Sequence, residues 1–181
     1  MKYLYVGGLG PETDGEALAR IRESTAAMFR TPVREIELPP VEFAYDAVRR
    51  QYRSVAVLEM LARTCPADAR KLVGVTGSDL FVPVLTFVFG QAQLDGPVAV
   101  VSLARLRQEF YGLPEDREVF LERAVKEALH ETGHTFGLVH CADTDCAMSL
   151  ATNVRHIDRK RAGFCPGCEG LARRRSGEQV L

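Results

Sequence analysis

Residues 130–140 of this chain are HETGHTFGLVH, a pattern that predicts a helix followed by a sharp turn. His130 and His134 are four residues apart, so on a helix both imidazoles lie on one face and can reach one ion. Gly137 lets the chain turn sharply, and His140 can then return as a third ligand. Three neutral imidazoles leave the fourth position on Zn²⁺ open for water, which is typical of catalytic sites. The competing interpretation is three unrelated surface histidines with a glycine that ends a helix.

Glu131 lies between the two helical histidines, where its carboxylate can act as a general base. It would accept a proton from water during attack on a carbonyl and later pass that proton to the leaving amine. Zinc would polarise the carbonyl oxygen as a Lewis acid. Because a structural zinc site needs no base, the pattern predicts metal-assisted amide hydrolysis. Two alternatives stay open: a non-catalytic zinc-binding module for protein or nucleic acid, and a hydrolase of non-peptide amides.

The motif should stand at the end of a long helix that begins after Pro114. Glu115 and Asp116 place negative charge in the first turn, where the helix dipole favours it. Apolar positions from Phe120 onward recur with the helical period, which predicts a packed inner face. Gly137 can adopt the left-handed conformation that ends a helix.

Strands and helices alternate through the first hundred residues, which predicts an α/β (α+β) fold with a mixed sheet. The run at 98–103 is almost purely apolar and suits a strand that is buried on both faces. Downstream of residue 141, regular periodicity is weak and metal-binding residue types are frequent. Helices are expected at 14–30 and 54–63, and strands at 2–6, 32–38, 72–76, 85–89 and 98–103.

Four of the five cysteines lie in two pairs within a 28-residue stretch. One pair surrounds a Pro-Gly turn, and four thiolates at this spacing fit a closed tetrahedral zinc site with no position for water. Such a site would be structural and would pin a short segment of little apolar content. Two disulfides or a redox C-x-x-C pair are the alternatives, and an N-terminal apolar run too short for a secretory signal favours metal. The candidate ligands are Cys141, Cys146, Cys165 and Cys168.

The composition is that of an ordinary globular chain: 181 residues, 46% hydrophobic, 26% charged, with a net charge of -1. These values exclude a fully disordered chain, and no run of about 18 apolar residues is present that could span a membrane. We expect a single domain over 1–181, with the sheet and active-site helix in 1–140 and the four-cysteine zinc site in 141–181. The apolar run at 3–6 is too short for a signal peptide, so we expect a cytoplasmic protein.

These residues together resemble the archaemetzincins, a family in the metzincin clan of zinc peptidases. The resemblance extends from about residue 71 to 168 and includes GVTGSDLFVPVLTFVFGQAQ at 74–93. It implies a metzincin-like fold with a mixed twisted sheet, an active-site helix and a Met-turn under the zinc, although Met148 could equally be a plain core methionine. In this clan an antiparallel edge strand aligns the peptide, and 85–89 is our candidate. The residues that carry the resemblance are His130, Glu131, His134, Gly137, His140, Cys141, Cys146, Met148, Cys165 and Cys168.

The two ligand sets predict two zinc ions per chain, one catalytic and one structural. We expect a peptide substrate, a monomeric protein and no membrane partner. The segment 151–175 carries seven Arg or Lys residues against Asp158 and Glu169. We interpret this run as a solvated face rather than as a nucleic-acid-binding surface.

Overall fold

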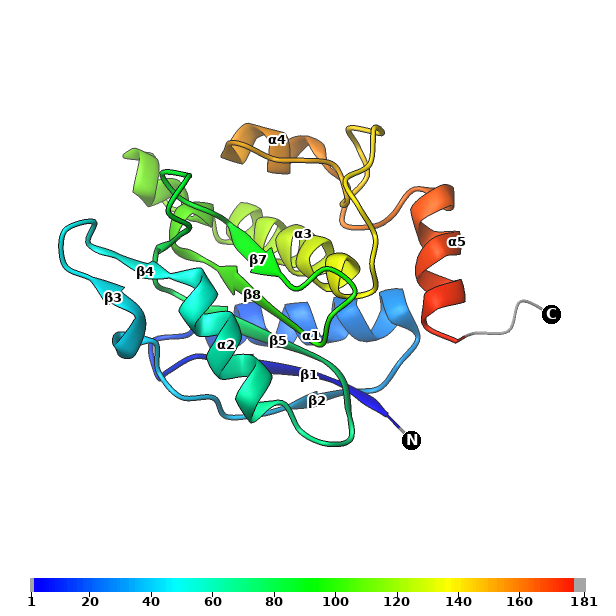
Figure 1. Cartoon of the computed structure of the whole chain (residues 1–181). Helices are drawn as coiled ribbons and strands as arrows, with labels where there is room; N and C mark the ends of the chain where they lie inside the picture. Colours follow the sequence, from blue (N-terminus) through cyan, green and yellow to red (C-terminus); the bar gives the residue numbers. More distant parts are fainter. Residues whose placement is uncertain (1, 178–181) are drawn as a thin grey trace.

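A five-stranded sheet forms the middle layer of the structure, a computed structural model that describes residues 2–177 (Figure 1). In spatial order its strands are β2 (Val33–Glu35), β1 (Tyr3–Gly8), β5 (Ala69–Thr76), β8 (Val98–Ser102) and β7 (Gly90–Ala92). The first four run parallel, and β7 pairs antiparallel with β8 at one edge. The predicted mixed sheet is therefore confirmed.

Strand β8 is buried along its whole length, as its apolar sequence predicted. Val98 and Val100 pack into the apolar cluster on one face of the sheet, whereas Ala99 and Val101 pack into the cluster on the other face. Successive side chains of a strand point to opposite faces, so this single run contributes to both cores.

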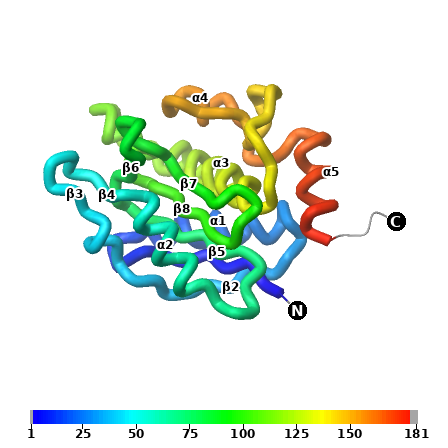
Figure 2. Tube along the Cα trace, viewed as in Figure 1, coloured from blue at the N-terminus to red at the C-terminus, as the bar shows by residue number. Residues whose placement is uncertain are grey.

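Helices cover both faces of this sheet (Figures 1 and 2). They are α1 (Gly15–Phe29), α2 (Ser54–Thr64) and α3 (Arg117–Thr135). α1 and α3 lie side by side on one face, where Ile21 and Leu121 share a core cluster with Val73. α2 covers the opposite face and packs Val57 and Leu61 against it. All of the helices expected up to residue 137 are thus present.

A smaller sheet and short 3-10 helices connect these layers. Strand β4 pairs with β3 antiparallel and with β6 parallel. The bounds of these elements are β3 (Tyr45–Asp46), β4 (Gln51–Arg53), β6 (Leu80–Phe81), η1 (Glu42–Ala44), η2 (Ala104–Leu106) and η3 (Gln108–Tyr111).

The segment 85–89, our candidate for the edge strand, is not a strand, so that prediction is wrong. Only one isolated bridge forms within it. Arg49 and Gln51 instead donate side-chain hydrogen bonds to two of its carbonyl oxygens, at 2.6 and 2.9 Å, and so satisfy the backbone without a neighbouring strand. The edge strand is the next segment, β7, which begins at Gly90. Glycine is rare in strands, which concealed this element in the sequence.

Two further helices follow residue 141, where the sequence pattern indicated little regular structure. They are α4 (Val154–Arg159) and α5 (Pro166–Arg175). The side chain of Asn153 caps α4, and Pro166 occupies the first turn of α5, where its missing N–H has no cost. Asn153 and Pro166 are the local sequence signs of these two helices, because both helices have too few apolar residues to show a helical period.

Aromatic packing joins the segment after residue 141 to the helices. Phe29 of α1 stacks on Phe136 with ring centroids 4.8 Å apart, and Phe164 meets Phe29 edge-on at 5.8 Å. These rings belong to one apolar cluster with the buried Met148. The expected single domain with two parts, 1–140 and 141–181, stays a prediction.

Within residues 2–177, no helix has both the length and the apolar character needed to cross a membrane.

Candidate active site and metal centres

Helix α3 presents the first part of the candidate site near its C-terminal end. His130 and Glu131 are each only 5% exposed, and His134, one turn further on, is partly exposed. Gly137, with a φ of 77°, then ends the helix, and its N–H donates to the carbonyl of His134 at 2.8 Å. The chain turns back at this point and brings the exposed His140 to the same place.

The three imidazoles converge on one point. The ring centroid of His130 lies 4.5 Å from that of His134 and 5.3 Å from that of His140. The centroids of His134 and His140 are 5.0 Å apart. Each ring can offer a nitrogen such that the three nitrogens lie within 4.8 Å of one another.

Backbone carbonyl groups orient two of these rings. Nδ1 of His130 donates to the carbonyl of Ala147 at 2.8 Å, and Nδ1 of His134 donates to that of Leu138 at 2.7 Å. Because a carbonyl oxygen can only accept, both protons are on Nδ1, and each neutral ring has a bare Nε2. The two Nε2 atoms are 3.0 Å apart. Two lone pairs at this distance repel unless they share a cation, so the donor set fits a divalent ion such as zinc.

The electrostatic surroundings keep the imidazoles neutral. Burial lowers the pKa of all three histidines, and it does so most for His130. The positive charge of Lys160 lowers the pKa of each ring further. A neutral imidazole is the form that binds a metal ion.

Two buried carboxylates stand one turn apart on α3 but differ in their partners. The ammonium group of Lys160 lies 3.0 Å from Oε1 of Glu127. For Glu131, by contrast, no hydrogen bond or ion pair of the carboxylate is found within residues 2–177. Burial raises the pKa of both carboxyl groups, and the neighbouring Glu127 raises that of Glu131 further. The charge of Lys160 lowers the pKa of Glu131 in part, but within the described chain this buried carboxylate has no hydrogen-bond or ion-pair partner.

A cavity of about 670 Å³ opens beside the histidines and Glu131. Its walls are mostly apolar, with a few convergent polar groups, as in many ligand-binding sites. The lining residues are Leu85, Thr86, Phe87, Val88, Phe89, Gly90, Gln91, Ala92, Leu94, Glu127, His130, Glu131, His134, Val139, His140, Leu150, Ala151 and Thr152.

Strand β7 forms one wall of this cavity with all three of its residues. In the described part of the chain it pairs with β8 on one side only. The N–H and C=O groups of its other edge are therefore available to an extended peptide.

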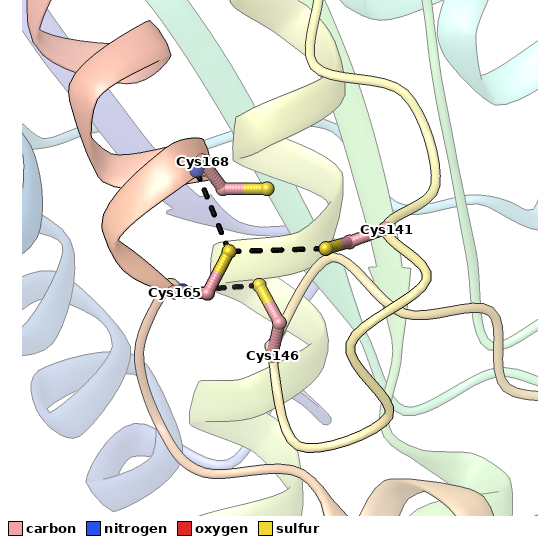
Figure 3. Close-up of side chains that lie close together, drawn as sticks. All are labelled: Cys141, Cys146, Cys165 and Cys168. Atoms are coloured by element: carbon pink, nitrogen blue, oxygen red, sulfur yellow. Dashed lines mark hydrogen bonds between the residues drawn. The ribbon is translucent and has the colours of Figure 1, made fainter.

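The four candidate cysteines form a second cluster (Figure 3). Cys165 and Cys168 come from the start of α5, and Cys141 and Cys146 come from the loop after the histidine motif. The four sulfur atoms lie within 4.8 Å of one another, and all four residues are free thiols. The disulfide alternative is therefore absent from this structure.

Backbone N–H groups surround the sulfur atoms. Cys146 Sγ accepts from the N–H of Met148 at 3.4 Å and from that of Cys165 at 3.2 Å. The N–H of Cys168, 3.5 Å from Cys165 Sγ, lowers the pKa of the Cys165 thiol, while burial raises the pKa of Cys146 and Cys168. Such donors favour the thiolate form, which is the form that binds zinc.

Comparison with known proteins places the chain in a family. The model of Peptidase family M54 matches residues 31–174. The chain belongs to this family. An archaemetzincin of Methanopyrus kandleri is 47% identical over 133 residues, which cover 74% of this chain and 72% of that protein. An archaemetzincin of Methanocaldococcus jannaschii is 42% identical over 134 residues, covering 72% and 73%.

Solved structures agree with this assignment. The crystal structure of archaemetzincin from Methanopyrus kandleri matches with a TM-score of 0.86 and 37% identity, covering 96% of this chain and 94% of that one. A zinc-dependent peptidase from Methanocorpusculum labreanum matches with a TM-score of 0.84 and 34% identity, covering 93% and 99%. The resemblance to archaemetzincins is confirmed, and the chain is a zinc metallopeptidase.

Met148 of this M54 peptidase is fully buried and lies against the helix that carries the histidines. Its sulfur occupies the space that a Cβ on Gly133 would need, so a glycine between His130 and His134 allows the contact. Met148 is thus a core methionine that packs against α3 between the two histidines, and its role as the methionine of a Met-turn stays a prediction.

Sequence reasoning missed several parts of the site. The Lys160–Glu127 pair, the carbonyl of Ala147 and the strand that begins at Gly90 all reach the site through tertiary contacts. The sequence carries one local sign of the strand that begins at Gly90. A glycine directly after the apolar run FVF indicates a place where another group approaches the backbone closely.

Proposed function

We propose that this M54 peptidase hydrolyses peptide bonds at the histidine cluster, with Glu131 as the general base. His130, His134 and His140 would hold the catalytic zinc through ring nitrogens, with two of the rings oriented by backbone carbonyl groups. The observation that carries the proposal is a buried, unpartnered carboxylate beside three convergent imidazoles in one cavity of the described chain.

The chemistry that zinc supplies when three imidazoles hold it is Lewis acidity, which polarises a carbonyl group and acidifies water. Glu131 takes a proton from the attacking water on a carboxylate oxygen and delivers it to the leaving amine nitrogen. Because no partner in the described chain engages this carboxylate, no other group competes for the proton. The cavity walls around these groups are mostly apolar.

The substrate would bind as an extended peptide along the free edge of β7. Gly90, the first residue of β7, lies against Glu131, so a peptide on this edge would run past the base. This alignment supports peptides over compact, non-peptide amides as substrates.

The cysteine cluster would hold a second, structural zinc. Cys141, Cys146, Cys165 and Cys168 supply four sulfur ligands, which leaves no position for substrate or water. The proposed content is therefore two zinc ions per chain. A monomeric, cytoplasmic protein that does not bind nucleic acid stays a prediction.

Digestion of a peptide library by the parent enzyme and by Glu131→Gln tests the proposal. The substitution keeps the shape of the side chain but removes its basicity, so we expect turnover to fall about 100- to 10,000-fold. Mass spectrometry of the products reports cleavage, and elemental analysis should return two zinc ions in both proteins. Undiminished turnover by Glu131→Gln would remove this residue from the mechanism, and a parent enzyme that binds peptides without cleaving them would indicate a binding module.

A further inference from the structure

We propose that Gly90 is a positioning residue that sets the orientation of the Glu131 carboxylate. This inference rests on the proposed role of Glu131 as the base. A Cβ atom at Gly90 would lie 2.5 Å from Cγ, 2.8 Å from Cδ and 2.7 Å from Oε1 of Glu131. Cβ atoms do not approach other heavy atoms this closely, so any side chain at this position collides with the glutamate.

Backbone conformation does not explain the glycine. Gly90 is not among the residues of positive φ, so alanine can adopt the same backbone without strain. Glycine is needed here because of space, and Glu131 supplies all three of the nearest atoms.

Strand β7 cannot withdraw from the collision. Gly90 pairs with Val101 of β8, and the carbonyl of the preceding residue accepts a hydrogen bond from the N–H of Ser102 at 2.8 Å. On the other side of Gly90, Oε1 of Gln91 accepts from the hydroxyl of Ser54 at 2.6 Å. The strand is thus fixed before and after the contact.

The glutamate side chain is the part that can move. Glu127, one turn earlier on α3, is held by Lys160, but no donor in the described chain holds the carboxylate of Glu131. Packing against the bare backbone of Gly90 is therefore what restrains Glu131 from the side of β7. A methyl group at Gly90 would rotate the carboxylate away from its place beside the histidines.

Gly90→Ala is the direct test. We expect kcat to fall about 10- to 100-fold, because a displacement of about 1 Å in a reacting group has an effect of this size. KM should stay within a few-fold, and zinc content should stay at the parent value. Gly74→Ala is the matched control: this glycine of β5 also lacks space, but its Cβ would meet the core residues Leu9 and Leu61. We expect Gly74→Ala to lower the melting temperature while kcat is kept.

A double-mutant cycle separates the contact from the chemistry. Gly90→Ala should lower the melting temperature of the zinc-loaded protein when Glu131 is present, and this loss should shrink in a Glu131→Ala background, where the colliding atoms are gone. If Gly90→Ala does not fold, Glu131→Ala should restore folding.

Two results would overturn the inference: full kcat in Gly90→Ala, or an equal loss of melting temperature in both backgrounds. Full activity of Glu131→Ala alone is a different failure. It would refute Glu131 as the base, while the melting cycle would still report whether the two residues collide.

Discussion

The histidine cluster and the cysteine cluster are both sets of metal-ligating side chains, but only one of them opens on a cavity. In each cluster the ligand atoms lie within 4.8 Å of one another. The three histidines line the cavity of about 670 Å³, whereas none of the four cysteines does. A ligand set that leaves a position to solvent suits catalysis, and a ligand set that surrounds the ion suits structure.

The two clusters share one short segment, the loop that follows α3. His140, the last ligand of the histidine cluster (the open cluster), is followed directly by Cys141, the first ligand of the cysteine cluster (the closed cluster). Ala147, which orients His130 through its carbonyl, lies between Cys146 and the buried Met148. We therefore expect the cysteine cluster to hold the backbone on which the orientation of His130 depends.

Cys146→Ser is expected to have the largest effect, because it breaks the supporting cluster. Structural zinc contributes on the order of 10 kcal/mol of binding free energy, which is comparable to the whole stability of a domain, about 5–15 kcal/mol. We expect loss of the structural zinc, loss of helicity by circular dichroism, and loss of hydrolysis as Ala147 ceases to hold His130. Elemental analysis should find fewer than two zinc ions per chain.

His134→Ala is the matched change in the open cluster. We expect it to abolish hydrolysis and release one zinc ion, while the circular dichroism spectrum stays that of the parent, since the cysteines and their N–H donors are untouched. The expected difference between the two clusters would be refuted if Cys146→Ser kept the circular dichroism spectrum and activity of the parent, or if His134→Ala lost both zinc ions.

Lys160→Met tests a buried ion pair that joins the segment before Cys165 to α3 without a metal ion. Lys160 lies in the segment between Met148 and Cys165, and its buried ammonium pairs with Glu127 of α3 at 3.0 Å. Removing one member of a buried ion pair costs about 3–5 kcal/mol. We expect a decrease of this size in the free energy of unfolding, measured with urea. The decrease should be greater at alkaline than at acidic pH, because the raised pKa of buried Glu127 makes its ionised form the costly one.

The double variant Lys160→Met/Glu127→Gln is the control for this prediction. It removes both charges, so it should recover part of the stability that the single variant loses. An equal loss in single and double variants would show that the cost comes from packing rather than from an unpaired charge.

Local spacing made the histidines and cysteines predictable, whereas tertiary contacts decided the rest. His130 and His134 share a helix face by geometry alone, and the apolar run of β8 required burial on both sides. The edge strand was misplaced because 85–89 is rich in strand-forming residues, yet side chains satisfy its backbone. The contact of Gly90 with Glu131 joins residues far apart in the chain, so no local pattern could have revealed it.

A substitution at Asp14, which lies outside both clusters, is expected to have the smallest effect on stability. Its carboxylate caps α1 through the N–H of Ala17 at 3.0 Å and pairs with Arg117 at 2.7 Å and with Arg107 at 3.1 Å. The hydrogen bonds from Arg117 hold the pKa of this carboxyl well below its usual range. A lowered pKa in the folded state means that the carboxylate stabilises the fold at neutral pH, and that this contribution is lost as the pH falls below about 4.

Asp14→Asn keeps a capping oxygen but removes the charge, so we expect a decrease of about 1–2 kcal/mol in the free energy of unfolding at neutral pH. Urea denaturation of parent and variant should show this difference shrinking as the pH is lowered from about 7 to about 3. Zinc content should be equal in the two proteins at each pH, because Asp14 touches neither cluster. A difference that is independent of pH would mean that the ion pairs are not its source, and a change in zinc content would mean that the clusters are coupled to the far end of α1.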